Sequence, residues 1–314
     1  MKSFRYLAAA LLAFIIWGFF SLAIRPLAGY ASLDILFFRV FISVTLMMVI
    51  GVFARRAAWK ETIQLFRKMT PAERRNWWLV TAGGGALLTA NWFFFIYVMN
   101  HVSVKVASFS YLICPILTTV LAFFILKEKL RWQQWIAVAL SLVSCVMLAL
   151  GHFADTAFSL IVAISYALYL IIQRRAGPVD KFVLLTIQMA FSALCLLPFY
   201  PVWGHNPGWD GFFLGMTSLI AVCFTIIPLM LNLYALQGAN SSTVGILLYI
   251  NPLINFALAI FYFGEKVTVM QLIAYSIIGF SILLFNAHYL RAMFTKPMWK
   301  KPLDRVSGPR RRNA

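Results

Sequence analysis

One stretch of this sequence occurs twice. The first copy reads CPILTTVLAFFILKEKLRWQQWIAVALSLVSCVMLAL, and the second reads NPLINFALAIFYFGEKVTVMQLIAYSIIGFSILLFNA. An offset of 137 residues places Pro115 on Pro252 and Glu128 on Glu265 without a gap. Each copy is expected to form an apolar helix, a short Glu-Lys turn and a second apolar helix, so the chain contains a structural duplication.

The composition places this duplication in a membrane. Of the 314 residues, 62% are hydrophobic and only 11% are charged, whereas soluble proteins have about 45–50% apolar and about 25% charged residues. The net charge of +18 therefore indicates topology rather than nucleic-acid binding, because Lys and Arg collect on the cytoplasmic side of membrane proteins. All four cysteines lie in apolar segments, so we expect no disulfide, metal or cofactor framework.

Ten segments are apolar enough, and long enough at roughly 20 residues, to cross a bilayer. We therefore predict an all-α integral membrane protein without a soluble domain. The expected spans are residues 6–24, 31–53, 77–99, 104–126, 132–151, 155–173, 182–203, 211–236, 241–263 and 269–290.

The basic residues predict the orientation. With the N-terminus inside, 23 of the 27 Lys and Arg residues lie on the cytoplasmic side, and only Arg39 falls within a span. Both termini are then cytoplasmic, and the apolar N-terminal segment is a retained helix rather than a cleaved signal peptide. Five helices separate the copies, so one Glu-Lys turn lies inside and the other outside. The two halves are expected to be inverted.

The first helices of each half match more weakly, at an offset of 149 that places Trp17 on Tyr166 and Arg39 on Gln188. The change of offset is explained if the loop 54–76 is longer than its counterpart around 204–210. We expect a first five-helix repeat over residues 1–151, a second, inverted repeat over 152–290 and a basic cytoplasmic tail over 291–314.

Inverted five-helix halves are typical of secondary transporters, because a twofold axis in the membrane plane lets one structure open to either side in turn. The substrate cavity is expected near the midplane, between the halves. Two alternatives remain at this point: a membrane-embedded enzyme acting on lipid-linked substrates, and a scaffold or sensor that transports nothing.

The Pro-bearing fourth and ninth helices, the Glu-Lys turns after them and the segment LDILFFRVFIS resemble the EamA family of the drug/metabolite transporter superfamily. LYLIIQRR at 168–175 and LLYINPLINFALAIFYFGE at 247–265 are most similar to its RarD-like branch. The resemblance implies a transporter, not an enzyme, in the bacterial cytoplasmic membrane, moving a small metabolite such as an amino acid, with export favoured. One departure is Lys127-Glu128, where the second copy has Gly264-Glu265.

Arg39 is the sharpest candidate for the site, because a charge within a span is costly and usually faces a cavity or a partner. It either contacts an anionic group of the substrate or has a structural role, held by Asp34 or by carbonyl groups of a neighbouring helix.

The other candidates are polar or aromatic residues within the spans, each of which also has a structural interpretation as an interhelical hydrogen bond or ordinary packing. Asn251 and Asn255 lie one helical turn apart beside Pro252, which removes a backbone hydrogen bond. We expect an asymmetric site, because polar groups are concentrated in the second copy, and we expect membrane lipids but no nucleic acid as further partners. The candidate set is Trp17, Arg39, Asn91, Tyr97, Tyr166, Gln188, Asn232, Tyr234, Asn251, Pro252 and Asn255.

Overall fold

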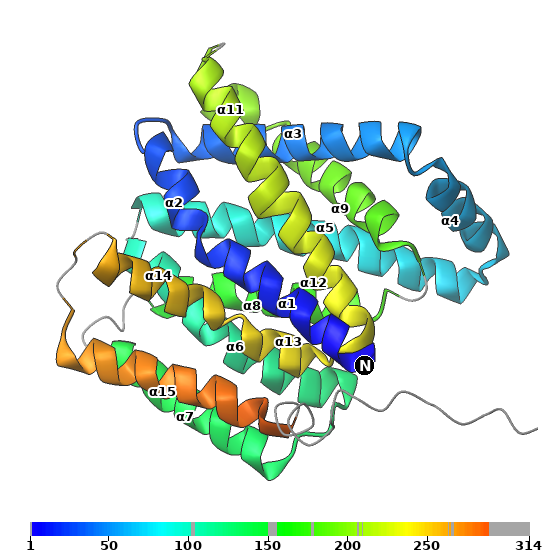
Figure 1. The fold of residues 1–314 in the computed structure, drawn as a ribbon. Coiled ribbons are helices and arrows are strands. Elements are labelled where there is room, and N and C mark those ends of the chain that lie inside the picture. Colours follow the sequence, from blue (N-terminus) through cyan, green and yellow to red (C-terminus); the bar gives the residue numbers. More distant parts are fainter. Residues whose placement is uncertain are drawn as a thin grey trace, which may run out of the picture.

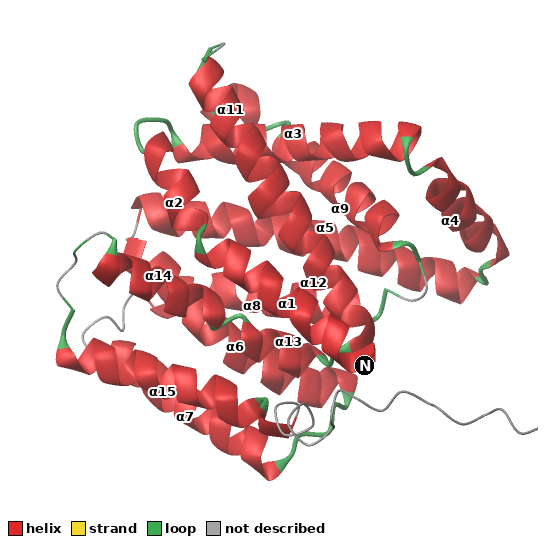
Figure 2. Ribbon diagram, viewed as in Figure 1, coloured by secondary structure: helices red, strands yellow, loops and turns green. Residues whose placement is uncertain are grey.

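A computed structural model gives the fold. It describes residues 2–288 except 102–103, 150–155, 177–178, 206, 209, 263 and 265–266, and within these ranges the chain forms helices and connecting loops but no strand (Figure 2). The chain is therefore all-α, as predicted. The predicted tail, 291–314, lies outside the described residues.

In the part that the structure describes, each of the ten expected spans coincides with helix. Four of them are interrupted, because the first, seventh, eighth and ninth each contain more than one helical element. The elements are α1 (Lys2–Gly18), α2 (Phe20–Ile24), η1 (Arg25–Leu27), α3 (Ser32–Phe53), α4 (Arg56–Lys68), α5 (Pro71–His101), α6 (Val104–Leu126), α7 (Trp132–Ala149), α8 (Thr156–Arg174), α9 (Lys181–Leu196), α10 (Tyr200–Trp203), α11 (Gly211–Leu219), η3 (Ile220–Ile226), α12 (Ile227–Gly238), α13 (Ser241–Leu247), α14 (Ile250–Phe261) and α15 (Val269–Phe285).

Four helical segments in the described part of the chain are long enough and apolar enough to cross a membrane: Phe4–Leu27, Leu33–Phe53, Gly211–Gly238 and Ser241–Leu258. Five further apolar helices are shorter, among them Ser110–Leu126 and Val269–Phe285. Many large apolar side chains point outward from these helices, including Phe124 and Phe280. An apolar surface of this kind suits a lipid environment.

Helices that correspond between the halves pack against each other. In Figure 1, α7 and α15 lie side by side at one edge, and α3 packs with α9 near the opposite edge. Between them, α6 packs on α13, and α6 with α5 encloses α8 much as α14 with α12 encloses α1. Exchanging the halves therefore leaves the set of helix contacts largely unchanged.

Hydrogen bonds follow the same 137-residue register. Thr118 Oγ1 donates to the Cys114 carbonyl at 2.9 Å, and in the second copy Asn255 Nδ2 lies 3.2 Å from the Asn251 carbonyl. At the next helix start, Gln134 accepts from the backbone N–H of Arg131. Its counterpart, Gln271, accepts in the same way from Thr268.

The departure at Lys127 has a clear backbone consequence. Lys127 has φ of 56°, and Gly264 at the equivalent position has φ of 65°. Both turns therefore use the left-handed conformation, which glycine adopts without strain and other residues adopt at a cost. The first copy keeps the shape of the turn although its residue is unfavourable there.

The loop 54–76 contains the amphipathic helix α4, whose 13 residues account for the longer connection in the first half. The sequence alignment needs one further insertion. Thr81 bonds back to Trp77 and Thr217 bonds back to Phe213, an offset of 136 rather than 137. The π-helix η3, which follows Thr217, restores 137, because a π-turn accommodates an extra residue. The prediction of a single insertion was therefore incomplete.

Candidate functional site

Arg39 projects from α3 among aromatic side chains. Its guanidinium carbon lies 4.6 Å from the centroid of the Trp92 ring of α5, a cation–π contact. Tyr111 of α6 is near enough to interact with Arg39 electrostatically. Within the described part of the chain, the Arg39 side chain makes no hydrogen bond or ion pair, and its Nε atom is buried without a partner.

Asp34, one of the structural partners considered for Arg39, is engaged elsewhere. Its Oδ1 accepts a hydrogen bond from the backbone N–H of His205 at 2.9 Å, and its Oδ2 lies 3.9 Å from the Nδ1 of the same histidine. Asp34 is 2% exposed. It therefore ties the start of α3 to the segment before α11 and leaves the Arg39 charge without a carboxylate among the described residues.

Trp17 and Tyr166, which the sequence alignment pairs, touch each other. Their ring centroids are 6.2 Å apart in an edge-to-face arrangement. Tyr166 also packs on Tyr169 at 5.8 Å and on Tyr111 at 6.4 Å. These four rings form an aromatic cluster between α1, α6 and α8, and Tyr111 links this cluster to Arg39.

The indole of Trp17 has a defined partner. Its Nε1–H donates to the Phe224 carbonyl in η3 at 2.8 Å. Pro228 lies four residues after Phe224 and has no N–H to donate to that carbonyl. Trp17 thus satisfies a backbone group that the proline leaves open, and it joins the two halves of the chain.

Three of the candidate amides bind neighbouring helices. Asn91 Nδ2 donates to the Val162 carbonyl at 2.9 Å, and Gln188 Nε2 lies 3.3 Å from the Val80 carbonyl. Asn232 Nδ2 donates to the Tyr166 hydroxyl at 3.2 Å, which connects Asn232 to the aromatic cluster. The Oδ1 of Asn232 and the Oε1 of Gln188 are buried without a hydrogen-bond partner, so both amides retain an unused acceptor.

The predicted pair in the ninth span lies on one helical face. Asn255 Nδ2 donates to Asn251 Oδ1 at 2.7 Å, and both side chains are partly exposed. Pro252 is buried, and the helix is interrupted at residues 248–249, between α13 and α14. In the first copy, Pro115 lies inside the continuous helix α6. Interrupted helices are typical of transporter substrate sites, and here the interruption is confined to the second copy.

Tyr234 lies apart from the other candidates that the structure describes. Tyr234 is 40% exposed and packs against Tyr6 with ring centroids 5.0 Å apart, so it belongs to the periphery of the molecule. The Tyr97 side chain lies outside the described residues. The structure thus brings together Trp17, Tyr166 and Asn232, keeps Asn251 with Asn255, and places Arg39 beside Trp92.

Sequence reasoning missed Trp92, Tyr111 and Gln173. Trp92 directly follows Asn91, and Tyr111 lies one helical turn before Pro115, but aromatic residues are too frequent in this chain for either position to stand out. Gln173 is 3% exposed, and neither its amide oxygen nor its amide nitrogen has a hydrogen-bond partner. Its signal was available, because a glutamine lies within the apolar segment of the sixth span.

The model of the EamA-like transporter family matches the sequence twice, over residues 4–150 and 156–287. Protein RarD of Streptomyces exfoliatus is 28% identical over 84% of this chain and 82% of its own length. Uncharacterized transporter YojE of Bacillus subtilis is 27% identical over 84% and 87%, and Protein RarD of Escherichia coli is 26% identical over 85% and 88%.

The fold also has a counterpart among solved structures. One crystal structure of a protein superposes with a TM-score of 0.69 over 93% of this chain and 99% of its own length. The sequence identity is 16%, so this similarity concerns the fold alone. The matches together cover nearly all of the helical region described above.

Proposed function

This chain belongs to the EamA-like transporter family, matched by both of its halves, and we propose that it is a secondary transporter. In this proposal it exports a small amphipathic metabolite with a negatively charged group, such as an amino acid, from the bacterial cytoplasm. It is a multi-pass membrane protein, and we propose that its ten spans form two inverted repeats that expose the site to each side in turn. Because the family consists of transporters, we no longer consider the two alternatives of a membrane-embedded enzyme and a non-transporting scaffold or sensor.

The observation that carries the choice of substrate class is the unpaired Arg39. A cation within a membrane span is costly without a counter-ion, and the partly buried Arg39 side chain has the face of Trp92 and the nearby Tyr111 but no carboxylate among the described residues. A carboxylate can form two parallel hydrogen bonds with a guanidinium. The nearby aromatic cluster and the amide of Asn232 suit an apolar or aromatic part of the same molecule.

Support for inverted halves comes from Glu128, which follows α6. Its carboxylate accepts from the backbone N–H groups of Ser241 at 2.7 Å and Ser242 at 3.1 Å, at the start of α13. The C-terminal end of α6 therefore meets the N-terminal end of α13. These counterpart helices run antiparallel, as inversion requires.

Contacts between the halves close the end of the molecule that we assign to the cytoplasm. Besides Glu128, Arg175 Nη2 donates to the Ile125 carbonyl at 3.0 Å, and Arg55 pairs with Asp180 at 2.8 Å. These contacts have to break when the protein opens toward the cytoplasm. Arg39, the proposed binding residue, lies farther along the helices, away from this end. Surface ion pairs are individually weak, at about 0–1 kcal/mol, so such a closure is readily reversible.

The test is uptake and efflux in proteoliposomes that contain only this protein. A panel should pair each carboxylate with its neutral amide, for example leucine with leucinamide and phenylalanine with phenylalaninamide. We expect flux of one or more carboxylates, at least about tenfold loss in Arg39→Gln, and partial recovery in Arg39→Lys, because losing one charged hydrogen-bonded contact costs about 1.5–3 kcal/mol.

The matched control is Lys60→Gln, which removes an exposed charge from α4 and should leave flux unchanged. Yield and monodispersity of each variant separate misfolding from loss of binding. Equal flux of carboxylates and amides through the unmodified protein, or normal flux through well-folded Arg39→Gln, would contradict the assignment of Arg39 to the substrate.

A further inference from the structure

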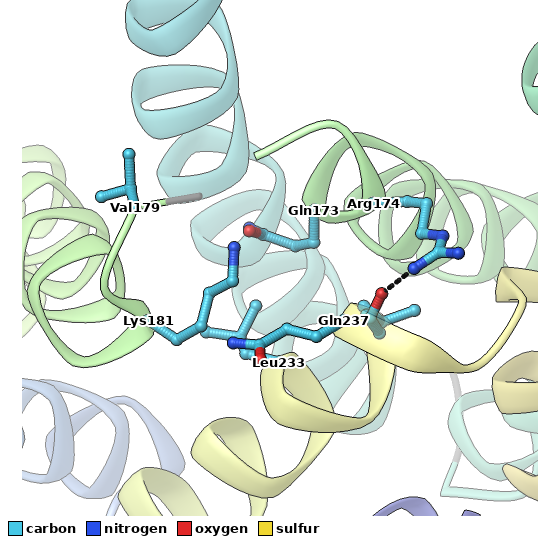
Figure 3. A pocket seen from close by; sticks show the side chains of 7 residues that line it. Gln173, Arg174, Val179, Lys181, Leu233 and Gln237 are labelled. Atoms are coloured by element: carbon cyan, nitrogen blue, oxygen red, sulfur yellow. Dashed lines mark hydrogen bonds between the residues drawn. The ribbon is translucent and has the colours of Figure 1, made fainter. Parts of the chain in front are cut away.

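A separate cavity of approximately 320 Å³ lies where α8 ends, α9 begins and α12 ends. Figure 3 shows side chains from these three regions converging on it. None of the residues predicted from the sequence lines this cavity. Its lining consists of Gln173, Arg174, Val179, Lys181, Leu233, Leu236 and Gln237.

Gln173 is the feature that points to a ligand. Its side chain extends into the cavity (Figure 3), the residue is 3% exposed, and both polar atoms of its amide lack a hydrogen-bond partner. Leaving such a group buried and unpaired is costly, so a ligand that pairs with it is favoured. Gly84 of α5 makes room for this arrangement, because a Cβ atom there would lie 2.6 Å from Gln173 Nε2.

Two cationic side chains give the cavity a positive charge. Arg174 donates through Nη1 to the Leu236 carbonyl, which fixes its guanidinium at the cavity wall. Lys181 approaches from the start of α9, and burial lowers its pKa; neighbouring Asp180 opposes that shift, and the charge of Arg174 adds to it. A negatively charged occupant would stabilise the buried ammonium group beside Arg174.

The Asp180 carboxylate neighbours Lys181 but makes its hydrogen bonds and its ion pair outside the cavity lining. Its Oδ1 accepts from the backbone N–H groups of Phe182 at 2.9 Å and Val183 at 3.2 Å, which caps α9. Its Oδ2 pairs with Arg55 of the other half at 2.8 Å. The carboxylate is thus engaged with the start of α9 and with Arg55, which directly precedes α4, outside the cavity lining.

The rest of the wall is apolar. Val179, Leu233 and Leu236 are each at most 3% exposed, and they face the polar side chains across a space large enough for a metabolite of a few carbon atoms. We propose that this cavity is a second binding site, at the cytoplasmic end of the molecule, for a small carboxylate with a short apolar chain. Gln173 and Lys181 bind the carboxylate, and the three apolar residues contact the chain.

The experiment measures thermal stabilisation of the purified full-length protein by butyrate and by butyramide, which differ in charge but hardly in shape. Inorganic phosphate, at matched ionic strength, is the third probe. A ligand of the native state raises the apparent stability as its concentration exceeds Kd. We expect saturable stabilisation by butyrate that exceeds that by butyramide or phosphate at least about fivefold in apparent affinity.

Two variants test the residues. Lys181→Gln should weaken butyrate binding about tenfold, and Gln173→Leu should do the same while the ligand-free protein melts at an equal or higher temperature, because an unpaired buried amide has been removed. Lys60→Gln is the control, since this exposed lysine of α4 lies outside the cavity lining.

Arg39→Gln should retain butyrate binding here, which separates this site from the proposed transport site. Equal stabilisation by butyrate and butyramide, or no saturable response at all, would overturn the proposal and leave the cavity as a space for water. Unchanged butyrate affinity in both Lys181→Gln and Gln173→Leu would also overturn it.

Discussion

Ser43 and Ser192 make equivalent pairs of hydrogen bonds in the two halves of the chain. Each hydroxyl bonds to the carbonyl four residues earlier in its own helix, at 2.6 Å for Ser43 and 3.0 Å for Ser192. Each also reaches a helix of the opposite half: Ser43 lies 3.4 Å from the Ala221 carbonyl, and Ser192 lies 3.3 Å from the Gly85 carbonyl. The two serines lie 149 residues apart, the same offset that places Arg39 on Gln188.

Replacing either serine by alanine should therefore lower stability to a similar extent. Interhelical hydrogen bonds in membranes contribute about 0.6 kcal/mol on average and at most about 1.7 kcal/mol. We expect Ser43→Ala and Ser192→Ala to fall in this range, measured by denaturant unfolding in detergent. Ser276→Ala is the control, because Ser276 bonds only within its own helix. A loss in the control as large as in the other two would show that the contact between halves contributes nothing.

Glu128→Ala should loosen the end of the molecule where α13 begins. The carboxylate satisfies two backbone N–H groups and accepts from the Ser242 hydroxyl at 2.5 Å, and a negative charge at a helix N-terminus is stabilising. In a cysteine-free background, we expect Thr243→Cys to react with a soluble maleimide several-fold faster when Glu128 is replaced. Glu61→Ala, an exposed acid on α4, should leave the rate unchanged.

Lys127→Gly should stabilise the protein by up to about 1 kcal/mol. A lysine at φ of 56° is strained by about 1–2 kcal/mol, and part of the relief is offset because glycine gains freedom in the unfolded chain. The melting temperature in detergent measures the change, with Lys129→Gly as the control two residues away. A lower melting temperature for Lys127→Gly than for Lys129→Gly would contradict this explanation of the turn.

Pro252→Ala and Pro115→Ala should differ in their effect on transport. Alanine at position 252 supplies the N–H that can bond to Leu248 and so joins α13 to α14. We expect at least a tenfold loss of flux without loss of melting temperature, because the interruption and the exposed Asn251 depend on the proline. Pro115 lies in a continuous helix, so flux through Pro115→Ala should fall less. The reverse order would place the functional interruption in the first copy.

The contact between Tyr30 and Asp210 should be insensitive to pH between about 5 and 9. The Tyr30 hydroxyl donates to the Asp210 carboxylate, which lowers the pKa of Asp210, and the same bond raises the pKa of Tyr30. The carboxylate contribution is present above the unfolded Asp pKa of about 3.9 and is lost as pH falls through the lower folded value. The tyrosine contribution is present below about 10 and is lost as pH rises through the higher folded value.

The measurement is the difference in melting temperature between the unmodified protein and Tyr30→Phe. It should stay constant from pH 5 to pH 9 and shrink below about pH 4, where the Asp210 carboxyl is protonated in the unfolded chain before it is protonated in the folded protein. A difference that disappears between pH 5 and pH 7 would indicate that another group controls this connection.

Features that repeat along the chain could be predicted from the sequence. The pairing of Asn251 with Asn255 follows from helical spacing, and the contact between Trp17 and Tyr166 joins residues that the alignment had already matched. Both predictions rely on helical periodicity and internal similarity, which can be read directly from the sequence. The membrane class follows in the same way from composition.

Contacts that depend on how helices cross could not be predicted. Trp92 lies over Arg39 only because α3 and α5 meet at that level, and Gln173 loses its partners only because α8 ends between α9 and α12. The π-helix has no local signal apart from Pro228 after it. In α4, by contrast, Trp59, Ile63 and Phe66 already lie on one side of a helix, but the surrounding basic residues led to the prediction of a plain loop.

The contact between Trp17 and Tyr166 has a consequence for the history of the chain. A residue that touches its own counterpart lies at the axis that relates the two halves, so in two separate, identical five-helix chains this position would meet a copy of itself. There, any substitution would change both sides of the contact at once. Within one chain that restriction does not apply, and the two positions differ: one is an indole that donates to the Phe224 carbonyl, and the other a phenol that accepts from Asn232.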